Sequence, residues 1–368
     1  MNSTDTINYS QIGFDYDKYL QLQKDGILKR IETYKDGKLY LEIGGKFLHD
    51  PHAARVLPGY KADIKKDIFS TMRSLSDLFF CVNYQDIKTN RQLKNSPEYY
   101  SDAVFRMAVE LQEAIKIKPK VVINLNERSQ KEIKTTFDKK LEESGYEYYK
   151  RYMIDGYPSD TNNVLSENGY GFDNYIETSK KLILVVGAAS NSGKMSTCLG
   201  QIYHDQKHGV MSGYSKFETF PIWSLPISHP VNLAYEAATA DIGDYNVIDT
   251  YHELAYGKRA VNYNRDVESF EIIKSLADNF LDKNNPMSGY RSPTDMGINY
   301  AGFAIKDDQV VCVASLNEIR RRRDWYQEVI DRGEGDLMWT KKCDSLELQA
   351  LKYIKEQGYN PDLSITSA

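Results

Sequence analysis

Residues 182–197 read LILVVGAASNSGKMST, an apolar run that passes directly into a glycine-containing loop. An unbroken apolar run of this length is typical of a central parallel strand that is covered on both faces. The residues behind the loop, as far as Gly209, have the pattern of a helix. This stretch therefore predicts a strand, a loop and a helix in succession, which is the unit from which α/β folds are built.

Elements of the same kind are predicted on both sides of this unit. Strands are expected at residues 38–43, 78–82, 120–125, 146–154 and 247–249, with helical stretches between them. One of these helices is expected to begin at Ser129, because Glu132 lies three residues later, as in a capping box. Alternating strands and helices favour parallel sheets with helices on their faces.

The length of 368 residues favours two domains rather than one. The segment at 156–175, GYPSDTNNVLSENGYGFDNY, is dense in Gly, Asn, Asp and Tyr and marks a boundary. We expect an α/β protein with two Rossmann-like or P-loop-like lobes, each with a parallel sheet, and a small helical C-terminal tail. The expected parts are a Rossmann-like lobe at 1–160, a P-loop-like lobe with site-lining loops at 161–310 and a helical segment at 311–368.

Composition narrows the class of partner. With 41% hydrophobic residues the chain can bury a core, and its net charge of −5 provides no broad basic surface for nucleic acid or anionic membranes. The four cysteines form no CxxC motif, which argues against a disulfide framework or a zinc knuckle. The N-terminus lacks a signal-peptide pattern, and the longest apolar run, 182–189, is too short to cross a bilayer. We expect a cytoplasmic protein with a small-molecule substrate and with no nucleic acid or membrane as partner; 28 tyrosines favour a homo-oligomer.

The loop behind the apolar run is the strongest candidate for chemistry. Consecutive backbone N–H groups and the positive end of the following helix bind phosphate oxygens, Gly193 allows close approach, and Lys194 reaches the terminal phosphates. The loop departs from the GxxxxGK[ST] pattern, because its first glycine is one residue early and Met195 replaces the metal-binding hydroxyl. An ordinary strand-to-helix turn is the alternative. The residues predicted to contact ATP or a related nucleotide here are Gly187, Ser190, Asn191, Ser192, Gly193, Lys194, Ser196 and Thr197.

A second glycine turn follows the first predicted strand. Gly44, Gly45 and Lys46 form a weaker copy of the same arrangement, and Lys46 with Arg55 is suited to clamp an anion. We therefore add Gly45, Lys46 and Arg55 to the predicted cofactor contacts, with an ordinary turn as the alternative.

The segment at 216–266 supplies the acidic candidates. They are Glu218, Glu236, Asp241, Asp244 and Asp249. Asp249 follows a short apolar strand, as a Walker B carboxylate does, and is predicted to hold Mg²⁺ together with Ser196. His252 is the predicted general acid or base, and the predicted catalytic set is Lys194, Asp249 and His252. A capping acid and a structural histidine are the alternatives at these two positions.

Six long strings in this chain resemble an uncharacterised bacterial family, that of domain of unknown function 1846. They are EIGGKFLHDPHAARVLPGY, GYGFDNYIET, SGKMSTCLGQIYHD, KFETFPIWSLPISHPVNLAYEAATAD, AVNYNRDVE and SPTDMGINYAGF. The resemblance extends from about Gly13 to about Arg323 and implies an α/β cytoplasmic protein with Rossmann-like or P-loop-like lobes. It also implies a further C-terminal domain that this chain lacks.

The GKMST string is in addition similar to the phosphate loops of dethiobiotin-synthetase-like and formyltetrahydrofolate-synthetase-like ligases. That resemblance, over about a dozen residues, implies ATP-dependent ligation or phosphoryl transfer to a small carboxylate or amine. The leading hypothesis is therefore a nucleotide-dependent small-molecule ligase or phosphotransferase. The alternatives are a non-catalytic nucleotide or phosphometabolite-binding protein, and a two-lobed nucleotide-sugar or sugar-phosphate transferase-like enzyme.

Overall fold

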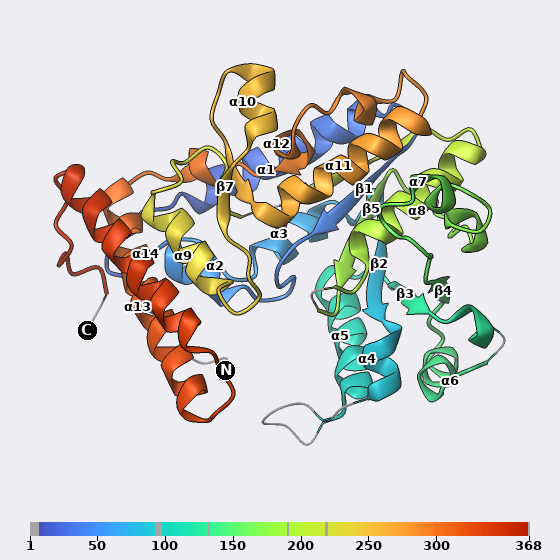
Figure 1. Ribbon diagram of the computed structural model, residues 1–368, viewed down its shortest axis with the longest axis horizontal. Helices are drawn as coiled ribbons and strands as arrows, with labels where there is room; N and C mark the ends of the chain where they lie inside the picture. The colour runs from blue at the N-terminus through green and yellow to red at the C-terminus, as the bar shows by residue number, and fades with distance from the viewer. Residues whose placement is uncertain are drawn as a thin grey trace.

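The centre of the molecule is one sheet of seven parallel strands (Figure 1). A computed structural model describes residues 7–90, 92, 98–131, 133–189, 191–217 and 220–366. The strands are β1 (Lys38–Ile43), β2 (Ser76–Asn83), β3 (Lys120–Asn126), β4 (Tyr148–Tyr152), β5 (Leu182–Gly187), β6 (Ser212–Phe217) and β9 (Gly297–Ile298), in the order β4-β3-β2-β5-β1-β6-β9. The predicted α/β class with a parallel sheet is confirmed. Strands from both predicted lobes are neighbours in this single sheet, because β5 lies between β2 and β1.

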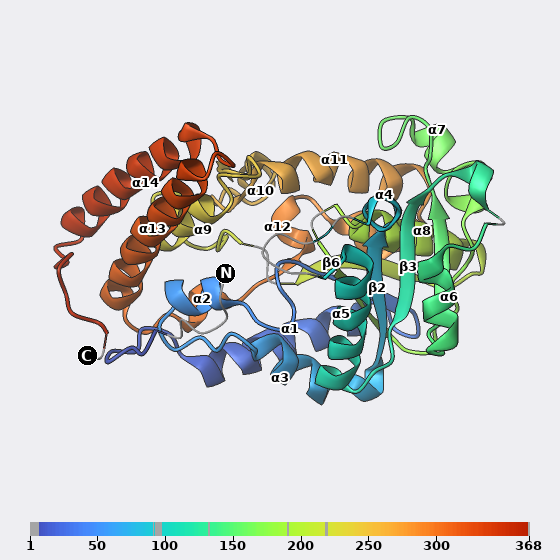
Figure 2. The same ribbon diagram turned by 90° about the horizontal axis from the view of Figure 1, so that it is seen from below.

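The side chains of β5 alternate between two hydrophobic cores. Leu182, Leu184 and Val186 belong to one core, and Ile183 and Val185 belong to the other. The first core contains residues of α1 (Tyr16–Thr33), α3 (Ile64–Thr71), α5 (Tyr100–Ile115) and α6 (Thr136–Glu143). The second contains residues of α8 (Lys194–Lys207) and α11 (Asn264–Asn279). Helices thus cover both faces, with α1 and α3 on one side and α11 on the other (Figure 2), which explains why the β5 run has no polar residue.

Two long helices, α13 (Asp308–Asp331) and α14 (Leu337–Glu356), form the C-terminal region and pack against each other and against α9 (Pro230–Ala238) (Figure 1). This confirms the predicted helical C-terminal segment. The other helices are α2 (Pro51–Val56), α4 (Tyr84–Thr89), α7 (Thr161–Val164), α10 (Thr250–Tyr256) and α12 (Pro293–Met296). Short 3-10 turns occupy Arg73–Leu75, Arg128–Gln130, Tyr170–Phe172, Pro286–Gly289 and Ala301–Ala304.

Two sequence-based expectations differ from the structure. The helix expected to begin at Ser129 begins instead at Thr136, where Thr135 and Asp138 form the capping box; Glu132 lies outside the described residues. The short strand expected at 247–249 is β7 (Asn246–Ile248), which pairs antiparallel with β8 (Val261–Tyr263) outside the parallel sheet. Both differences arise because a local sequence pattern does not determine which of several nearby residues begins a helix or which strand a short segment pairs with.

The four cysteines, Cys81, Cys198, Cys312 and Cys343, are free and buried. The expectation of no disulfide framework is therefore confirmed. Within the described ranges, none of the helices combines the length and apolar character needed to span a lipid bilayer.

Candidate functional site

The loop at 188–193 lies where the sheet topology changes direction. From β2 the chain passes through α5 to β3 on one side, whereas from β5 it passes through α8 to β6 on the other side. The two connecting helices cover opposite faces of the sheet. The connections that leave the neighbouring carboxyl ends of β2 and β5 therefore diverge, and such a switch point is where open α/β sheets bind ligands.

Two glycines give this loop its shape. A Cβ atom on Gly187 would lie 2.1 Å from the Ser192 hydroxyl, and one on Gly193 would lie 2.7 Å from Cγ of Asn124. Gly193 also has a φ of +82°, a left-handed conformation that a side chain disfavours. No other residue type fits either position without a shift of the backbone or of its neighbours.

Polar residues from β3 and β4 hold the loop in place. The Asn124 amide donates to the Ser192 carbonyl (2.8 Å), and its Oδ1 accepts from the Thr197 hydroxyl (3.1 Å) and from Arg151 (3.2 Å). Arg151 is buried and forms an ion pair with Asp173 at 2.9 Å. Sequence reasoning missed Asn124 and Arg151, although Asn124 was visible as a polar residue in the apolar run KVVINL and Arg151 as a charged residue in the strand predicted at 146–154.

The N-terminus of α8 is suited to an anion. Gly193 is the N-cap, so no side chain of its own satisfies the first-turn N–H groups. Among the described residues, the buried hydroxyl of Ser192 has no hydrogen-bond partner. Lys194 begins the helix, and its ammonium lies 3.9 Å from Oε1 of Glu42. Helix dipole, backbone donors and lysine charge thus add up at one point.

Glu42, near the end of β1, is the carboxylate beside Lys194. It accepts a hydrogen bond from the Tyr214 hydroxyl at 2.7 Å, and Lys216 of β6 pairs with Asp266 of α11. Burial works to lower the pKa of Lys216, but the Asp266 and Glu42 carboxylates outweigh it and raise that pKa, so its ammonium stays charged. Sequence reasoning missed Glu42 and Lys216; the signal for Glu42 was a charged residue within a strand-like run, whereas the segment around Lys216 was not predicted as a strand.

The residues predicted to hold Mg²⁺ are not brought together. Thr197 is buried, and its hydroxyl contacts Asn124, Arg151 and the Gly193 carbonyl. The Ser196 hydroxyl lies 3.4 Å from Arg151. Asp249 is the N-cap of α10, which both views place far from α8 (Figures 1 and 2).

The carboxylate of Asp249 is fully buried and already satisfied. It accepts from the His252 amide (2.9 Å), from Asn262 (3.1 Å) and from the hydroxyl and amide of Thr294 (2.7 and 3.1 Å). β7, which precedes it, is not a strand of the parallel sheet. The capping alternative therefore describes Asp249, and the predicted pair with Ser196 does not fit a magnesium ion.

The GGK turn adjoins the SGK loop, because β1 and β5 are neighbouring strands. The buried ammonium of Lys65 holds this turn by donating to the carbonyls of Gly44 (3.3 Å) and Lys46 (3.1 Å). Gly45 and Lys46 are exposed at this edge of the sheet. Arg55 is not part of the turn, because it pairs with Glu318 of α13 at 2.9 Å. The predicted clamp therefore lacks its arginine.

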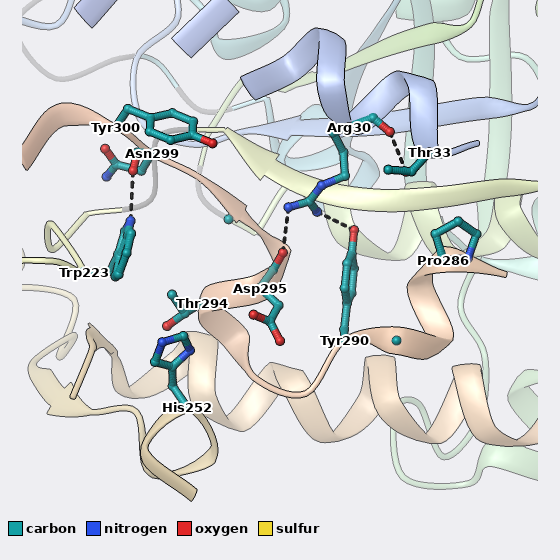
Figure 3. A pocket seen from close by; sticks show the side chains of 12 residues that line it. Arg30, Thr33, Trp223, His252, Pro286, Tyr290, Thr294, Asp295, Asn299 and Tyr300 are labelled. Carbon is teal, nitrogen blue, oxygen red and sulfur yellow. Dashed lines mark hydrogen bonds between the residues drawn. The ribbon is translucent and has the colours of Figure 1, made fainter. Parts of the chain in front are cut away.

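His252 lies in a different place, where it lines a pocket together with Trp223 and Arg30 (Figure 3). The predicted catalytic set is thus split between the loop, which holds Lys194, and this pocket region, which holds Asp249 and His252. The other acids have structural partners: Glu236 pairs with Lys342, Asp244 with Arg265, and Asp241 accepts from Tyr326. Ser190 and Glu218 lie outside the described residues.

Comparison with known proteins gives one family. The family described as "Domain of unknown function DUF1846, N-terminal" matches residues 12–350. A UPF0371 protein of Streptococcus uberis is 45% identical over 322 residues, which cover 87% of this chain and 63% of that protein. UPF0371 proteins of Streptococcus pyogenes serotype M1 and Streptococcus pneumoniae strain JJA are also 45% identical, over 321 and 318 residues. The chain spans 63% of the length of these relatives.

Proposed function

The chain belongs to the family of the domain of unknown function DUF1846, and for this member we propose a nucleotide-dependent small-molecule ligase or phosphotransferase. The nucleotide, ATP or a relative of it, is held at the loop of residues 187–197. One observation carries the proposal: the N-terminus of α8, with Lys194 as its first residue, opens at the switch point of the sheet without a side-chain cap.

The physical support comes from donors that are fixed in place before a ligand arrives. Asn124 and Arg151 hold the loop, so its N–H groups need no reorganisation to meet phosphate oxygens. Lys194 supplies positive charge for the terminal phosphates, whereas the charge of Lys216 is already paired with Asp266. Glu42 restrains Lys194 and lies beside the ammonium that the phosphates would meet.

Magnesium has no assigned step in this proposal. Ser196 and Asp249 do not meet, and Met195 occupies the place of the usual metal-binding hydroxyl. An ion that arrives with the nucleotide would be held through the phosphates. The effect of Mg²⁺ on ligand binding is therefore a quantity to be measured in the test below.

A nucleotide-sugar or sugar-phosphate transferase is the second candidate. The observation that favours it is the adjacency of the GGK and SGK turns on the neighbouring strands β1 and β5. Two glycine turns side by side suit a diphosphate that extends along the sheet edge. Protection of both turns by a nucleotide sugar, but not by ATP, would select this candidate.

The test is thermal stabilisation of the protein by ATP, GTP, a nucleotide sugar and inorganic phosphate, each with and without Mg²⁺. A ligand at about one hundred times its dissociation constant stabilises the folded state by about 2.7 kcal/mol. We expect Lys194→Ala to abolish the rise in melting temperature that the ligand causes. Lys207→Ala, at the other end of the same helix, is the matched control and should show the same rise as the parent protein.

The outcomes separate the hypotheses. No shift with any of these ligands, or an equal shift in Lys194→Ala, would refute the phosphate site. A nucleotide shift without turnover over a panel of small carboxylates and amines would favour the non-catalytic alternative. A cytoplasmic location, a small-molecule partner and a homo-oligomeric state belong to the same proposal, and cell fractionation and light scattering test the location and the oligomer.

A further inference from the structure

A pocket of about 400 Å³ opens between α1, α10, the Pro286–Gly289 turn and α12 (Figure 3). Its volume is within the range of small-molecule sites. The side chains that matter here are Arg30, Trp223, His252, Tyr290, Asp295 and Tyr300. None of them belongs to the loop at 187–197, so this pocket is separate from the proposed nucleotide site.

Arg30 brings an unneutralised positive charge to this pocket. Its guanidinium donates to the hydroxyls of Ser215 (2.8 Å) and Tyr290 (2.6 Å) and to the Asp295 carbonyl (2.9 Å), all of which are neutral. Among the described residues, it forms no ion pair with a carboxylate. Three of its five N–H donors are thereby used, and the planar fork keeps capacity for an anionic oxygen.

Asp295 brings a negative charge to the same pocket. Its Oδ2 accepts from the Tyr256 hydroxyl and from the Arg291 amide, both at 2.8 Å. The Arg30 guanidinium bonds to the carbonyl of Asp295 rather than to its carboxylate (Figure 3). The two charges are therefore presented to one space without neutralising each other.

His252 and Trp223 complete the wall with fixed orientations. The Asp295 amide donates to the Ser292 hydroxyl (3.3 Å), and this hydroxyl is hydrogen-bonded to Nδ1 of His252 (3.0 Å), which fixes the position of the ring. The Trp223 indole donates to the Asn299 carbonyl at 2.9 Å, which fixes the ring. Two aromatic rings held by hydrogen bonds thus lie beside the two charges.

We propose that this pocket binds a small zwitterion of the α-amino acid class, with its carboxylate on Arg30, its ammonium on Asp295 and its side chain against Trp223 and Tyr300. A ligand with only a carboxylate would be repelled by Asp295. A ligand with only an amine would be repelled by Arg30. The zwitterion alone satisfies both groups, since an α-amino acid carries an ammonium and a carboxylate on the same carbon.

The experiment is titration calorimetry with the twenty proteinogenic L-amino acids, followed by two analogues of the best binder, one without the amino group and one without the carboxylate. We expect the dissociation constant of each analogue to be at least about tenfold higher than that of the amino acid, because each analogue lacks a charge-assisted contact. Arg30→Gln should weaken binding of the amino acid but not binding of the analogue that keeps only the amino group. Asp295→Asn should weaken binding of the amino acid but not binding of the analogue that keeps only the carboxylate.

Because each variant is expected to lose affinity for some ligands and not for others, these measurements distinguish loss of a direct contact from loss of folding, which would weaken binding of every ligand alike. Arg73→Gln, an exposed arginine in the Arg73–Leu75 turn, is the matched control and should bind as the parent protein does. If Arg30→Gln fails to fold, Asp295→Asn with the two analogues gives the same decision. The proposal is overturned if no amino acid binds at millimolar concentration, or if the carboxylate analogue binds as tightly as the amino acid.

Discussion

Replacing Gly193 by alanine is expected to destabilise the protein far more than replacing Gly209, although both glycines flank α8 with similar backbone angles. Their φ values are +82° and +72°. Each alanine would have to adopt the left-handed region, which costs about 1–2 kcal/mol for a residue with a Cβ atom. Strain alone therefore predicts similar losses of folding free energy.

The surroundings of the two glycines differ. A Cβ on Gly209 would meet nothing within 4 Å, whereas one on Gly193 would lie 2.7–2.9 Å from three atoms of the Asn124 side chain. Asn124 would have to move, and its hydrogen bonds to Ser192, Thr197 and Arg151 would weaken, each worth about 1 kcal/mol. We expect Gly193→Ala to lower the free energy of unfolding by about 3–4 kcal/mol and Gly209→Ala by about 1–2 kcal/mol.

Equilibrium urea denaturation, followed by circular dichroism, measures both losses in parallel. The same two proteins should differ in ligand binding, because only Gly193→Ala distorts the loop at the N-terminus of α8. Equal losses for the two variants would refute the reasoning, since they would mean that Asn124 does not hold the loop against Gly193.

Three further predictions concern buried groups. Burial works to raise the pKa of Glu318, but hydrogen bonds from Arg321 and His52 lower it more, to a value well below its usual range. A carboxyl group whose pKa is lowered by folding stabilises the fold at pH values above its unfolded-state pKa, which is about 4.3. Glu318→Gln should therefore lower the free energy of unfolding by about 3 kcal/mol at neutral pH, and the difference between parent and variant should shrink as pH falls below about 4.5. A difference in unfolding free energy that does not change with pH would contradict this. Thr197→Val should cost about 1–3 kcal/mol in urea denaturation, because four hydrogen-bond partners lose the hydroxyl, and a loss no larger than that of Ser196→Ala would count against it. Burial raises the pKa of Cys81 to about 11, and all four thiols are buried, so a thiol reagent at pH 8 should modify none in the folded protein and all four after unfolding.

β1, β2, β3 and β5 are predictable because each contains a short apolar run that ends at glycine or a polar residue, whereas β6 (SGYSKF) and β9 (Gly297–Ile298) have no such run and were not predicted. The strands predicted at 38–43 and 120–125 are β1 and most of β3. The order of the strands is not predictable from such runs. Insertion of β5 between β2 and β1 depends on pairing between segments more than 100 residues apart, such as Ser76 with Leu182 and Leu39 with Leu182, for which a local pattern holds no information.

The candidate site shows the same limit. The SGK loop is visible in the sequence because strand, loop and helix are contiguous in the chain. The prediction for Arg55 is wrong because its partner, Glu318, is 263 residues away. Asp249 resembles a metal ligand because a short apolar run precedes it, but the two residues Val247 and Ile248 do not distinguish a sheet strand from a small hairpin. Glu42 had a usable signal, since an acid inside an apolar strand is costly to bury and therefore indicates a partner.

The strand β6 connects the two proposed sites and decides which variants can test them separately. The Tyr290 hydroxyl donates to the Tyr214 carbonyl at 2.8 Å, and the Tyr214 hydroxyl donates to Glu42 at 2.7 Å, beside Lys194. A change at Tyr290 would therefore disturb the strand that supports the phosphate loop as well as the pocket. The carboxylate of Asp295 contacts the Tyr256 hydroxyl and the Arg291 amide, neither of which belongs to β6, so Asp295→Asn alters the pocket with the least effect on Lys194.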